Sequence, residues 1–340
     1  MTDMQHRILG DTGFPVSEFA LGTMMFGKMG NPDHDDSIRI IHRALDAGID
    51  FIDTADVYSL GESEEIVGKA LRGRRDDVVL ATKFGLPIDA VPGHGGASRR
   101  WIVQSVENSL RRLGTDYIDL YQLHRPDYDT ALEETLSALS DLVTAGKIRA
   151  FGSSTFPADR IVEAQWAAAR RGTHRFLSEQ PMYSIFTRSL EAAVLPAAQR
   201  HDMGVLTYSP LNGGWLSGHA DVASRHRAGS RPAMYDPTTP GGAAKTAALA
   251  ELRSVAADAG LTMPQLALGF VLAHPAITSV IIGPRTQEQL DGLLTGVGVR
   301  LDAATLDRID AIVPPGTDVS PDDNYNAAPP ALIDASLRRR

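Results

Sequence analysis

Four side chains that could carry out proton chemistry stand at or just after the ends of apolar runs. Asp53 closes the run 49–52, Tyr58 follows in the next turn, Lys83 ends the run 78–82 and His124 ends the run 117–123. An ammonium beside a phenol favours the phenolate and should lower the pKa of the phenol, while a carboxylate could hold that ammonium by a charge-assisted hydrogen bond. An imidazole could orient a carbonyl oxygen. Each residue alone could be an ordinary polar strand end, but together the four predict a proton-donating site.

The elements that would bring these residues together alternate along the chain. Strand-like runs lie near 20–22, 49–53, 78–82, 117–123, 148–152, 176–179, 204–208 and 278–282. Helix-like segments lie at 35–47, 62–72, 99–113, 131–145, 157–170, 190–201, 245–259 and 263–273, with extra turns at 286–294 and 302–312. Eight strands alternating with helices imply a parallel sheet joined by crossovers, and this number in 340 residues favours a closed (β/α)₈ barrel over an open sheet.

The remaining segments predict one domain over residues 1–340. Residues 7–10 and 15–19 flank a turn and indicate a small N-terminal β-hairpin. Segments 84–97 and 211–244 follow strand carboxyl ends, so they should form long loops on the active face of the barrel. Residues 314–340 are expected to form an extended C-terminal tail.

Composition restricts the classes of partner. The chain is 43% hydrophobic with a formal net charge of −9 and no cysteine. We therefore expect no nucleic-acid binding, no disulfide or cysteine metal site, and a cytoplasmic location. The sequence shows neither a signal-peptide core nor a long apolar stretch, so no membrane association is expected. The histidines lack metal-ligand spacing, and nothing demands assembly beyond a monomer or a weak homo-oligomer.

A hydride carrier is the partner that a proton-donating site would need. The dinucleotide pattern G-x-G-x-x-G is absent directly after a strand, so a Rossmann site is not indicated. Barrels offer another phosphate site, in the loops after the seventh and eighth strands beside a helix start. Here Gly283, Arg285 and Thr286 follow the eighth strand, and Gln289 lies in the next helical run. Arg285 and Thr286 could bind the adenosine 2′-phosphate, although a solvated arginine at a helix start is the alternative.

Four motifs resemble the aldo-keto reductase family. They are 48–58 (GIDFIDTADVY) with 61–64 (GESE), 80–83 (LATK), 117–124 (YIDLYQLH) and 146–149 (GKIR). The resemblance covers roughly residues 7–313, in the order of the family. It implies that Tyr58 is the general acid/base, that Lys83 and Asp53 tune it, and that His124 positions the carbonyl of a small-molecule substrate.

The same resemblance implies NADP(H) as cofactor, with NAD(H) not excluded. Tyr208 would stack on the nicotinamide, while Gln180 and Ser154 would meet its carboxamide. Thr155 stands where the family has an asparagine, and Gly292 stands where many members have an adenine-contacting asparagine. The expected cofactor-binding residues are Gly22, Thr23, Met24, Ser154, Thr155, Gln180, Tyr208, Ser209, Pro210, Leu211, Gly283, Arg285, Thr286 and Gln289. Phe26, Trp101 and Trp215 are the candidate walls of a substrate pocket.

Three functions remain open at this level. The first is an NADP(H)-dependent oxidoreductase that acts on aldehydes or ketones by hydride transfer. The second is a cofactor-sensing or channel-associated subunit that keeps the reductase fold, since a fold alone does not decide function. The third is a Schiff-base lyase that uses Lys83, which would need a lowered amine pKa.

Overall fold

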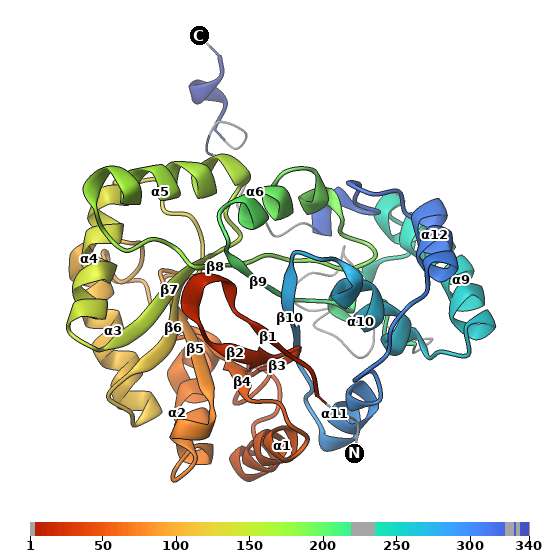
Figure 1. Cartoon of the computed structure of the whole chain (residues 1–340), viewed down its shortest axis with the longest axis horizontal. Coiled ribbons are helices and arrows are strands. Elements are labelled where there is room, and N and C mark those ends of the chain that lie inside the picture. Colours follow the sequence, from red (N-terminus) through yellow and green to blue (C-terminus); the bar gives the residue numbers. More distant parts are fainter. Residues whose placement is uncertain (1–3, 219–234, 324–329, 331–333, 340) are drawn as a thin grey trace.

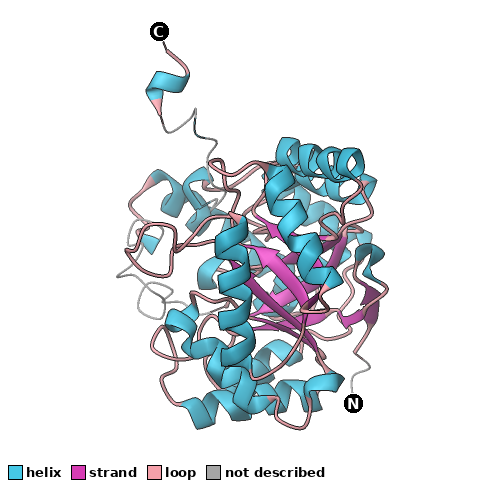
Figure 2. Ribbon diagram, turned by 90° about the vertical axis from the view of Figure 1, so that its left-hand side faces the viewer, coloured by secondary structure: helices cyan, strands magenta, loops and turns pink. Residues whose placement is uncertain are grey.

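The computed structural model describes all residues except 1–3, 219–234, 324–329, 331–333 and 340. Within this part of the chain, eight parallel strands close into a barrel in the order β10-β3-β4-β5-β6-β7-β8-β9. Helices surround the strands (Figure 1; Figure 2). The strands are β3 (Phe19–Gly22), β4 (Phe51–Asp53), β5 (Val79–Phe84), β6 (Ile118–Leu123), β7 (Ile148–Ser154), β8 (Ser178–Gln180), β9 (Gly204–Thr207) and β10 (Ile277–Ile282). The predicted (β/α)₈ barrel is confirmed.

Side-chain alternation along the strands separates two buried layers. Phe51, Ala81 and Leu120 belong to an apolar cluster built from alternate residues of neighbouring strands, so this cluster fills the barrel interior. Ile52 and Tyr121 belong to the larger cluster that packs against the helices. Residues two positions beyond an interior residue point into the barrel again, nearer the carboxyl end of their strand. This periodicity decides which side chains reach the mouth of the barrel.

The predicted N-terminal hairpin closes the opposite end. Strands β1 (His6–Ile8) and β2 (Pro15–Ser17) pair in antiparallel register. Leu9 and Val16 are fully buried in the interior cluster. Gly10 has a φ of +50°, and a Cβ there would lie 2.4 Å from the backbone nitrogen of Gly204. The hairpin therefore packs tightly against the barrel, which leaves the carboxyl ends of the strands as the open face.

Ten helices described here follow the strands or extend the barrel. They are α1 (His34–Asp46), α2 (Glu62–Ala70), α3 (Arg99–Leu113), α4 (Leu132–Thr144), α5 (Ala158–Arg171), α6 (Val194–Arg200), α9 (Pro240–Asp258), α10 (Met263–Ala273), α11 (Gln287–Leu294) and α12 (Ala303–Ile312). Sequence signals set their ends: the Ser98 hydroxyl accepts a hydrogen bond from the Trp101 N–H, and Gly114 adopts a left-handed φ of +64° after α3.

Two predicted helices differ from those observed. The expected helix 190–201 is divided into a 3₁₀ turn (Ser189–Ala192) and α6, with Ala193 between them at a φ of −146°. Pro196 explains the break, because its ring would clash with the carbonyl of residue 192 in a continuous helix. The helix expected to begin at 245 begins at Pro240, because Thr239 caps it by accepting a hydrogen bond from the Gly242 N–H. The predicted loop 211–244 is therefore shorter, and its residues 219–234 lie outside the described part.

The start of the predicted tail packs on the barrel. The backbone N–H groups of Arg188 and Ser189 each donate to Asp318 Oδ1 at 2.8 Å, and the Ser189 hydroxyl donates to Asp318 Oδ2 at 2.8 Å. Lys245 Nζ in α9 lies 2.6 Å from Asp323 Oδ2, and both side chains are almost fully buried. Residues 334–339, by contrast, stand away from the body of the protein (Figure 1).

Candidate active site

Strand periodicity brings the carboxylate, the ammonium and the imidazole to the same place. Asp53 lies two residues beyond interior Phe51 and Lys83 lies two beyond interior Ala81, so both point into the barrel near its mouth. His124 lies four residues beyond interior Leu120, directly after β6. All three side chains are buried. The structure thus brings together the residues that the sequence placed at strand ends.

Lys83 connects the members of the site. Its Nζ donates to Asp53 Oδ2 at 2.5 Å, to the Thr54 carbonyl at 2.9 Å and to the Tyr58 hydroxyl at 3.3 Å. The rings of Tyr58 and His124 meet edge to face, with centroids 5.9 Å apart. Three acceptors therefore use the three protons of one ammonium, and one of those acceptors is the phenol.

A strained turn holds Tyr58 in place. Tyr58 begins the short 3₁₀ segment Tyr58–Gly61, in which Ser59 and Leu60 have left-handed φ values of 49° and 59°. The Ser59 hydroxyl donates to the Phe26 carbonyl at 2.8 Å and accepts from the Met29 N–H at 3.0 Å. Non-glycine residues pay about 1–2 kcal/mol to adopt this conformation, so the surrounding contacts must impose it. The loop after β3 thereby fixes the turn that carries the phenol.

The pKa of Tyr58 shifts opposite to the expected direction. Burial raises the pKa of this phenol, and the Lys83 ammonium offsets only part of that effect. The hydroxyl is therefore protonated near neutral pH, as a proton donor must be. Burial by itself would lower the pKa of Lys83, but Asp53 and Tyr58 outweigh burial and raise it. Lys83 consequently stays an ammonium, which argues against the Schiff-base reading.

His124 is a neutral imidazole. Burial, helped by the charges of Lys83 and Arg125, holds the pKa of His124 well below its ordinary value. Its Nδ1 has no hydrogen-bond partner among the described residues. A neutral ring has one N–H to donate, so His124 can orient a carbonyl oxygen without protonating it.

Two glutamines support Asp53 from the far side. Its Oδ1 accepts hydrogen bonds from Gln122 Nε2 at 3.2 Å and from Gln180 Nε2 at 2.8 Å. Gln180 also donates to Gln122 Oε1 at 3.2 Å. Gln122 was missed by the sequence reasoning, although its position two residues before His124 marks it as an interior residue. The carboxamide contact assigned to Gln180 stays a prediction.

The predicted nicotinamide end gathers around Thr155. The Ser154 hydroxyl donates to the Gln180 carbonyl at 2.8 Å, and the Thr155 hydroxyl lies 3.5 Å from that of Tyr208. Thr155 has a left-handed φ of 59°. Arg125 Nη1 donates to Thr155 Oγ1 at 3.0 Å. Arg125 was also missed, although it directly follows His124 in the sequence.

The predicted phosphate end lies at the start of α11. Thr286 caps this helix by accepting from the Gln289 N–H at 3.2 Å, and Gln289 Oε1 accepts from the Arg285 N–H at 2.8 Å. Arg285 is half-buried, and Gly283 and Thr286 are exposed beside it. The segment after the adjacent strand β9 holds Ser209 at a left-handed φ of 55°, with Pro210 and Leu211 following. An exposed helix N-terminus with an arginine suits a phosphate, so these residues fit the expected cofactor.

The other predicted residues differ in accessibility. Gly22 and Thr23 are buried at the end of β3, where the Thr23 hydroxyl donates to the Asp53 carbonyl at 3.2 Å, whereas Met24 is 37% exposed. The candidate pocket walls Phe26, Trp101 and Trp215 are all buried. His94 stacks on Trp101 with centroids 5.1 Å apart, and Lys245 Nζ lies 4.8 Å from the Trp215 ring centre. Their contact with a substrate stays a prediction.

Two buried carboxyl groups lie directly behind the site. Asp56, two residues before Tyr58, accepts from the Ser105 hydroxyl at 3.1 Å, and burial together with nearby Glu64 raises the pKa of Asp56 to about 7. Glu179 accepts from the Ser153 hydroxyl at 2.5 Å and from the Phe156 N–H at 3.0 Å, and burial raises its pKa to about 7. Both carboxyl groups also accept from backbone N–H groups beside predicted site residues, Asp56 from Val57 and Glu179 from Phe156.

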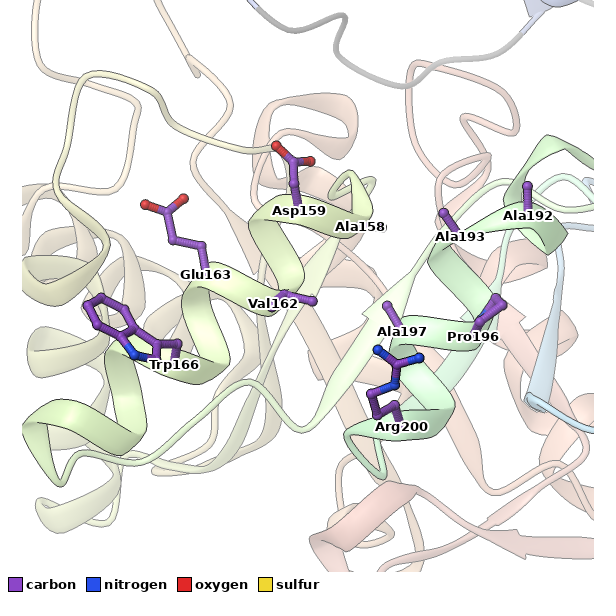
Figure 3. A pocket seen from close by; sticks show the side chains of 10 residues that line it. All are labelled: Ala158, Asp159, Val162, Glu163, Trp166, Ala192, Ala193, Pro196, Ala197 and Arg200. Atoms are coloured by element: carbon purple, nitrogen blue, oxygen red, sulfur yellow. The ribbon is translucent and has the colours of Figure 1, made fainter.

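A separate groove runs between α5 and α6 on the outside of the barrel (Figure 3). Its volume is about 700 Å³, and Val162, Trp166, Pro196 and Arg200 are among its lining residues. The tetrad of Asp53, Tyr58, Lys83 and His124 does not line it, so this groove is not the place of the predicted proton chemistry. Among the described residues, no cluster of His, Asp or Glu is arranged to hold a metal ion.

No described helix by itself has the length and apolar character needed to cross a membrane. Among the described helices, the pair α9 and α10 taken together meets that test, and the two are bent by 91° at the break between them.

Comparisons with known proteins agree with this geometry. The model of the Aldo/keto reductase family matches residues 18–314. An uncharacterized oxidoreductase of Bacillus subtilis, YrpG, is 39% identical over 92% of this chain and 96% of its own length. The aldo-keto reductase YhdN of the same organism is 36% identical over 91% of this chain and 94% of its own length. A probable voltage-gated potassium channel subunit beta of Arabidopsis thaliana is 33% identical over 91% of this chain and 97% of its own length.

Proposed function

This chain belongs to the Aldo/keto reductase family of oxidoreductases, and we propose that it interconverts aldehydes or ketones and their alcohols with NADP(H). One observation carries the proposal. A single buried ammonium, Lys83, lies between the Asp53 carboxylate at 2.5 Å and the Tyr58 hydroxyl at 3.3 Å. A proton donor held by a cation and next to a neutral imidazole is what carbonyl reduction requires of a protein.

NADP(H), when bound, supplies or accepts the hydride at the carbonyl carbon. Tyr58 donates its proton to the carbonyl oxygen during reduction, and the Lys83 ammonium stabilises the phenolate that remains. Asp53 keeps Lys83 protonated and in place, supported by Gln122 and Gln180. His124 donates a hydrogen bond to the carbonyl oxygen and so aims it at Tyr58.

The residues proposed to hold the cofactor lie at the ends of the neighbouring strands β7, β8, β9 and β10 or just after them. Ser154, Gln180 and Tyr208 would contact its nicotinamide end, and Arg285 with Thr286 would bind the 2′-phosphate. The helix N-terminus of α11 adds backbone N–H groups and a favourable dipole for the phosphate. A guanidinium at this place supports NADP(H) over NAD(H), because the latter has no 2′-phosphate.

The test follows cofactor absorbance with NADPH and NADH separately, over panels of aldehydes, ketones and sugars. We expect carbonyl-dependent oxidation of NADPH that is faster than that of NADH at equal concentrations. A cofactor that binds but is not oxidised with any carbonyl would contradict the reductase proposal.

A second candidate function rests on the relative named as a potassium channel subunit beta. In this role the chain would bind the cofactor and report its redox state to a partner protein with little turnover. Stoichiometric cofactor binding without oxidation across the whole carbonyl panel would favour it. The complete tetrad favours the enzyme instead, because a sensor needs no proton donor.

A further inference from the structure

Arg125 stands at the active face with its guanidinium fixed in place. It follows His124 at the end of β6 and is half-buried. Its Nη1 donates to the His124 carbonyl at 2.6 Å and to the Thr155 hydroxyl at 3.0 Å. Thr155 is itself held, because its N–H donates to the Gln180 carbonyl at 3.2 Å. The guanidinium thus spans the loops after β6 and β7, beside the tetrad.

The charge of Arg125 is not matched by a carboxylate in the described part of the chain. No ion pair includes Arg125 there, and its Nε and Nη2 make no hydrogen bond to a described residue. Neighbouring arginines differ: Arg160 pairs with Glu163, and Arg112 pairs with Glu64. A half-buried cation without a counter-charge is costly, and a bound anion would offset that cost.

The nearby acids are already engaged. Glu179 lies close enough to Arg125 for that charge to act on the pKa of its carboxyl group. Its oxygens accept hydrogen bonds from the Ser153 hydroxyl and the Phe156 N–H. Asp127 accepts from the Ala97 N–H at 2.6 Å and from the Thr130 hydroxyl at 2.7 Å. Neither turns a carboxylate oxygen to Arg125 within hydrogen-bond distance. The guanidinium therefore keeps donors for a ligand.

Arg125 also lies within electrostatic reach of the reacting groups. The charge of Arg125 acts to lower the pKa of Tyr58 and of Tyr208, where the larger effect of burial raises it. The same charge acts to lower the pKa of His124, where burial lowers it too. Lys83 is the other cation that acts on Tyr58 and His124, and Asp53 and Tyr58 already use it. Arg125 is the cation left for a substrate group.

We propose that Arg125 makes this enzyme select carbonyl substrates that carry a carboxylate, such as oxo acids with an aldehyde at the far end. The guanidinium would bind the carboxylate through its paired N–H donors while the carbonyl lies at Tyr58 and His124. A carboxylate suits a single planar fork, whereas a phosphate dianion calls for more donors than one arginine offers. The inference rests on the proposed reductase function and adds a substrate class to it.

The experiment compares 4-oxobutanoate with its methyl ester, which has the same aldehyde but no charge. Hydrogen bonds to charged groups are worth about 1.5–3 kcal/mol, so kcat/KM should favour the acid by about 10- to 100-fold. Arg125→Met should bring the acid-to-ester ratio of kcat/KM to about one, whatever the change in the rate with the ester itself. Arg125→Lys should keep part of the preference for the acid over the ester. The control Arg39→Met, which removes an exposed arginine paired with Asp36, should keep all of that preference. A series of ω-oxo acids of two to six carbons would locate the best spacing.

Each failure has a distinct meaning. Equal kcat/KM for acid and ester, or a preference that survives in Arg125→Met, would overturn the role of Arg125 and leave the reductase proposal intact. Preference for glyceraldehyde 3-phosphate over both the acid and uncharged glyceraldehyde would mean that Arg125 selects a phosphate group, and it would overturn the carboxylate proposal. Absence of turnover with every carbonyl would remove the reductase proposal and this inference with it. Should Arg125→Met fail to fold, the unaltered enzyme decides: raising NaCl from 50 to 500 mM must slow the acid more than the ester, and equal slowing overturns the inference.

Discussion

Replacing Lys83 with methionine should destabilise the fold by about 3–5 kcal/mol. Lys83 is fully buried and Asp53 is 2% exposed, so the substitution leaves a carboxylate inside the barrel without its cation. Gln122 and Gln180 would still donate to Asp53 Oδ1, but amides do not cancel its charge. Urea unfolding at pH 7, followed by circular dichroism and extrapolated to water, gives the free energy of unfolding.

A double-mutant cycle separates this electrostatic effect from lost packing. Asp53→Asn removes the charge but keeps an oxygen that can accept from the two glutamines. Adding it to Lys83→Met should therefore recover about 2 kcal/mol or more of the stability lost by Lys83→Met alone. The pKa of Lys83 is raised in the folded protein, and this sets the pH range in which the ion pair stabilises the fold. The stabilisation by the ion pair is complete below the pKa of lysine in the unfolded chain, about 10.4, and is lost only as the pH rises above that value.

Lys245→Met is the matched control, because Lys245 and Asp323 form another buried pair at 2.6 Å. It should also destabilise the fold, yet it should retain carbonyl reduction, whereas Lys83→Met should lose it. Additive losses in the Lys83 and Asp53 cycle would refute the reasoning, since they would mean that the two charges do not interact across 2.5 Å.

Three further outcomes are expected. The pKa of Asp56 is raised to about 7, so folding protonates this group between about pH 4 and about pH 7, and its contribution to stability should fall by up to roughly 4 kcal/mol over that range. Asp56→Asn should remove that share of the pH slope in urea titrations and leave the share of Glu179, whose pKa is also raised to about 7. Leu60 is 80% exposed at a φ of 59°, so Leu60→Gly should raise the free energy of unfolding by about 0.5–1 kcal/mol, and a lower urea midpoint would contradict the strain. Arg285→Ala should weaken NADPH binding by about 10- to 100-fold and leave NADH unchanged in fluorescence titrations; equal weakening of both would remove the 2′-phosphate contact.

The barrel and the meeting of Asp53, Tyr58, Lys83 and His124 could be predicted from the sequence because both depend on local patterns. Asp53, Lys83 and His124 follow apolar runs, and a parallel barrel collects all strand carboxyl ends on one face. Pro196 also signals the helix break at Ala193. The apolar periodicity over 190–201 nevertheless favoured one continuous helix, so the break was not predicted. The start of α9 at Pro240 was hidden by two glycines that usually mark a loop.

The missed residues depend on three-dimensional contacts. Gln122 supports Asp53 from a different strand, and Arg125 reaches Thr155 across two loops, so neither pairing has a sequence spacing to reveal it. The pKa of Tyr58 was misjudged for a similar reason. Its direction is a balance between burial and the Lys83 charge, and burial is known only once the barrel is closed.

In the proposed reaction, Tyr58 donates the proton to the carbonyl oxygen. The most direct test of this step compares NADPH oxidation by the unaltered enzyme and by Tyr58→Phe, with NADPH binding measured in parallel by fluorescence. Phenylalanine keeps the ring that packs against His124 and removes only the hydroxyl that Lys83 contacts. We predict that turnover falls by about 10²- to 10⁴-fold while the Kd for NADPH is unchanged. Full turnover in Tyr58→Phe would mean that Tyr58 is not the proton donor.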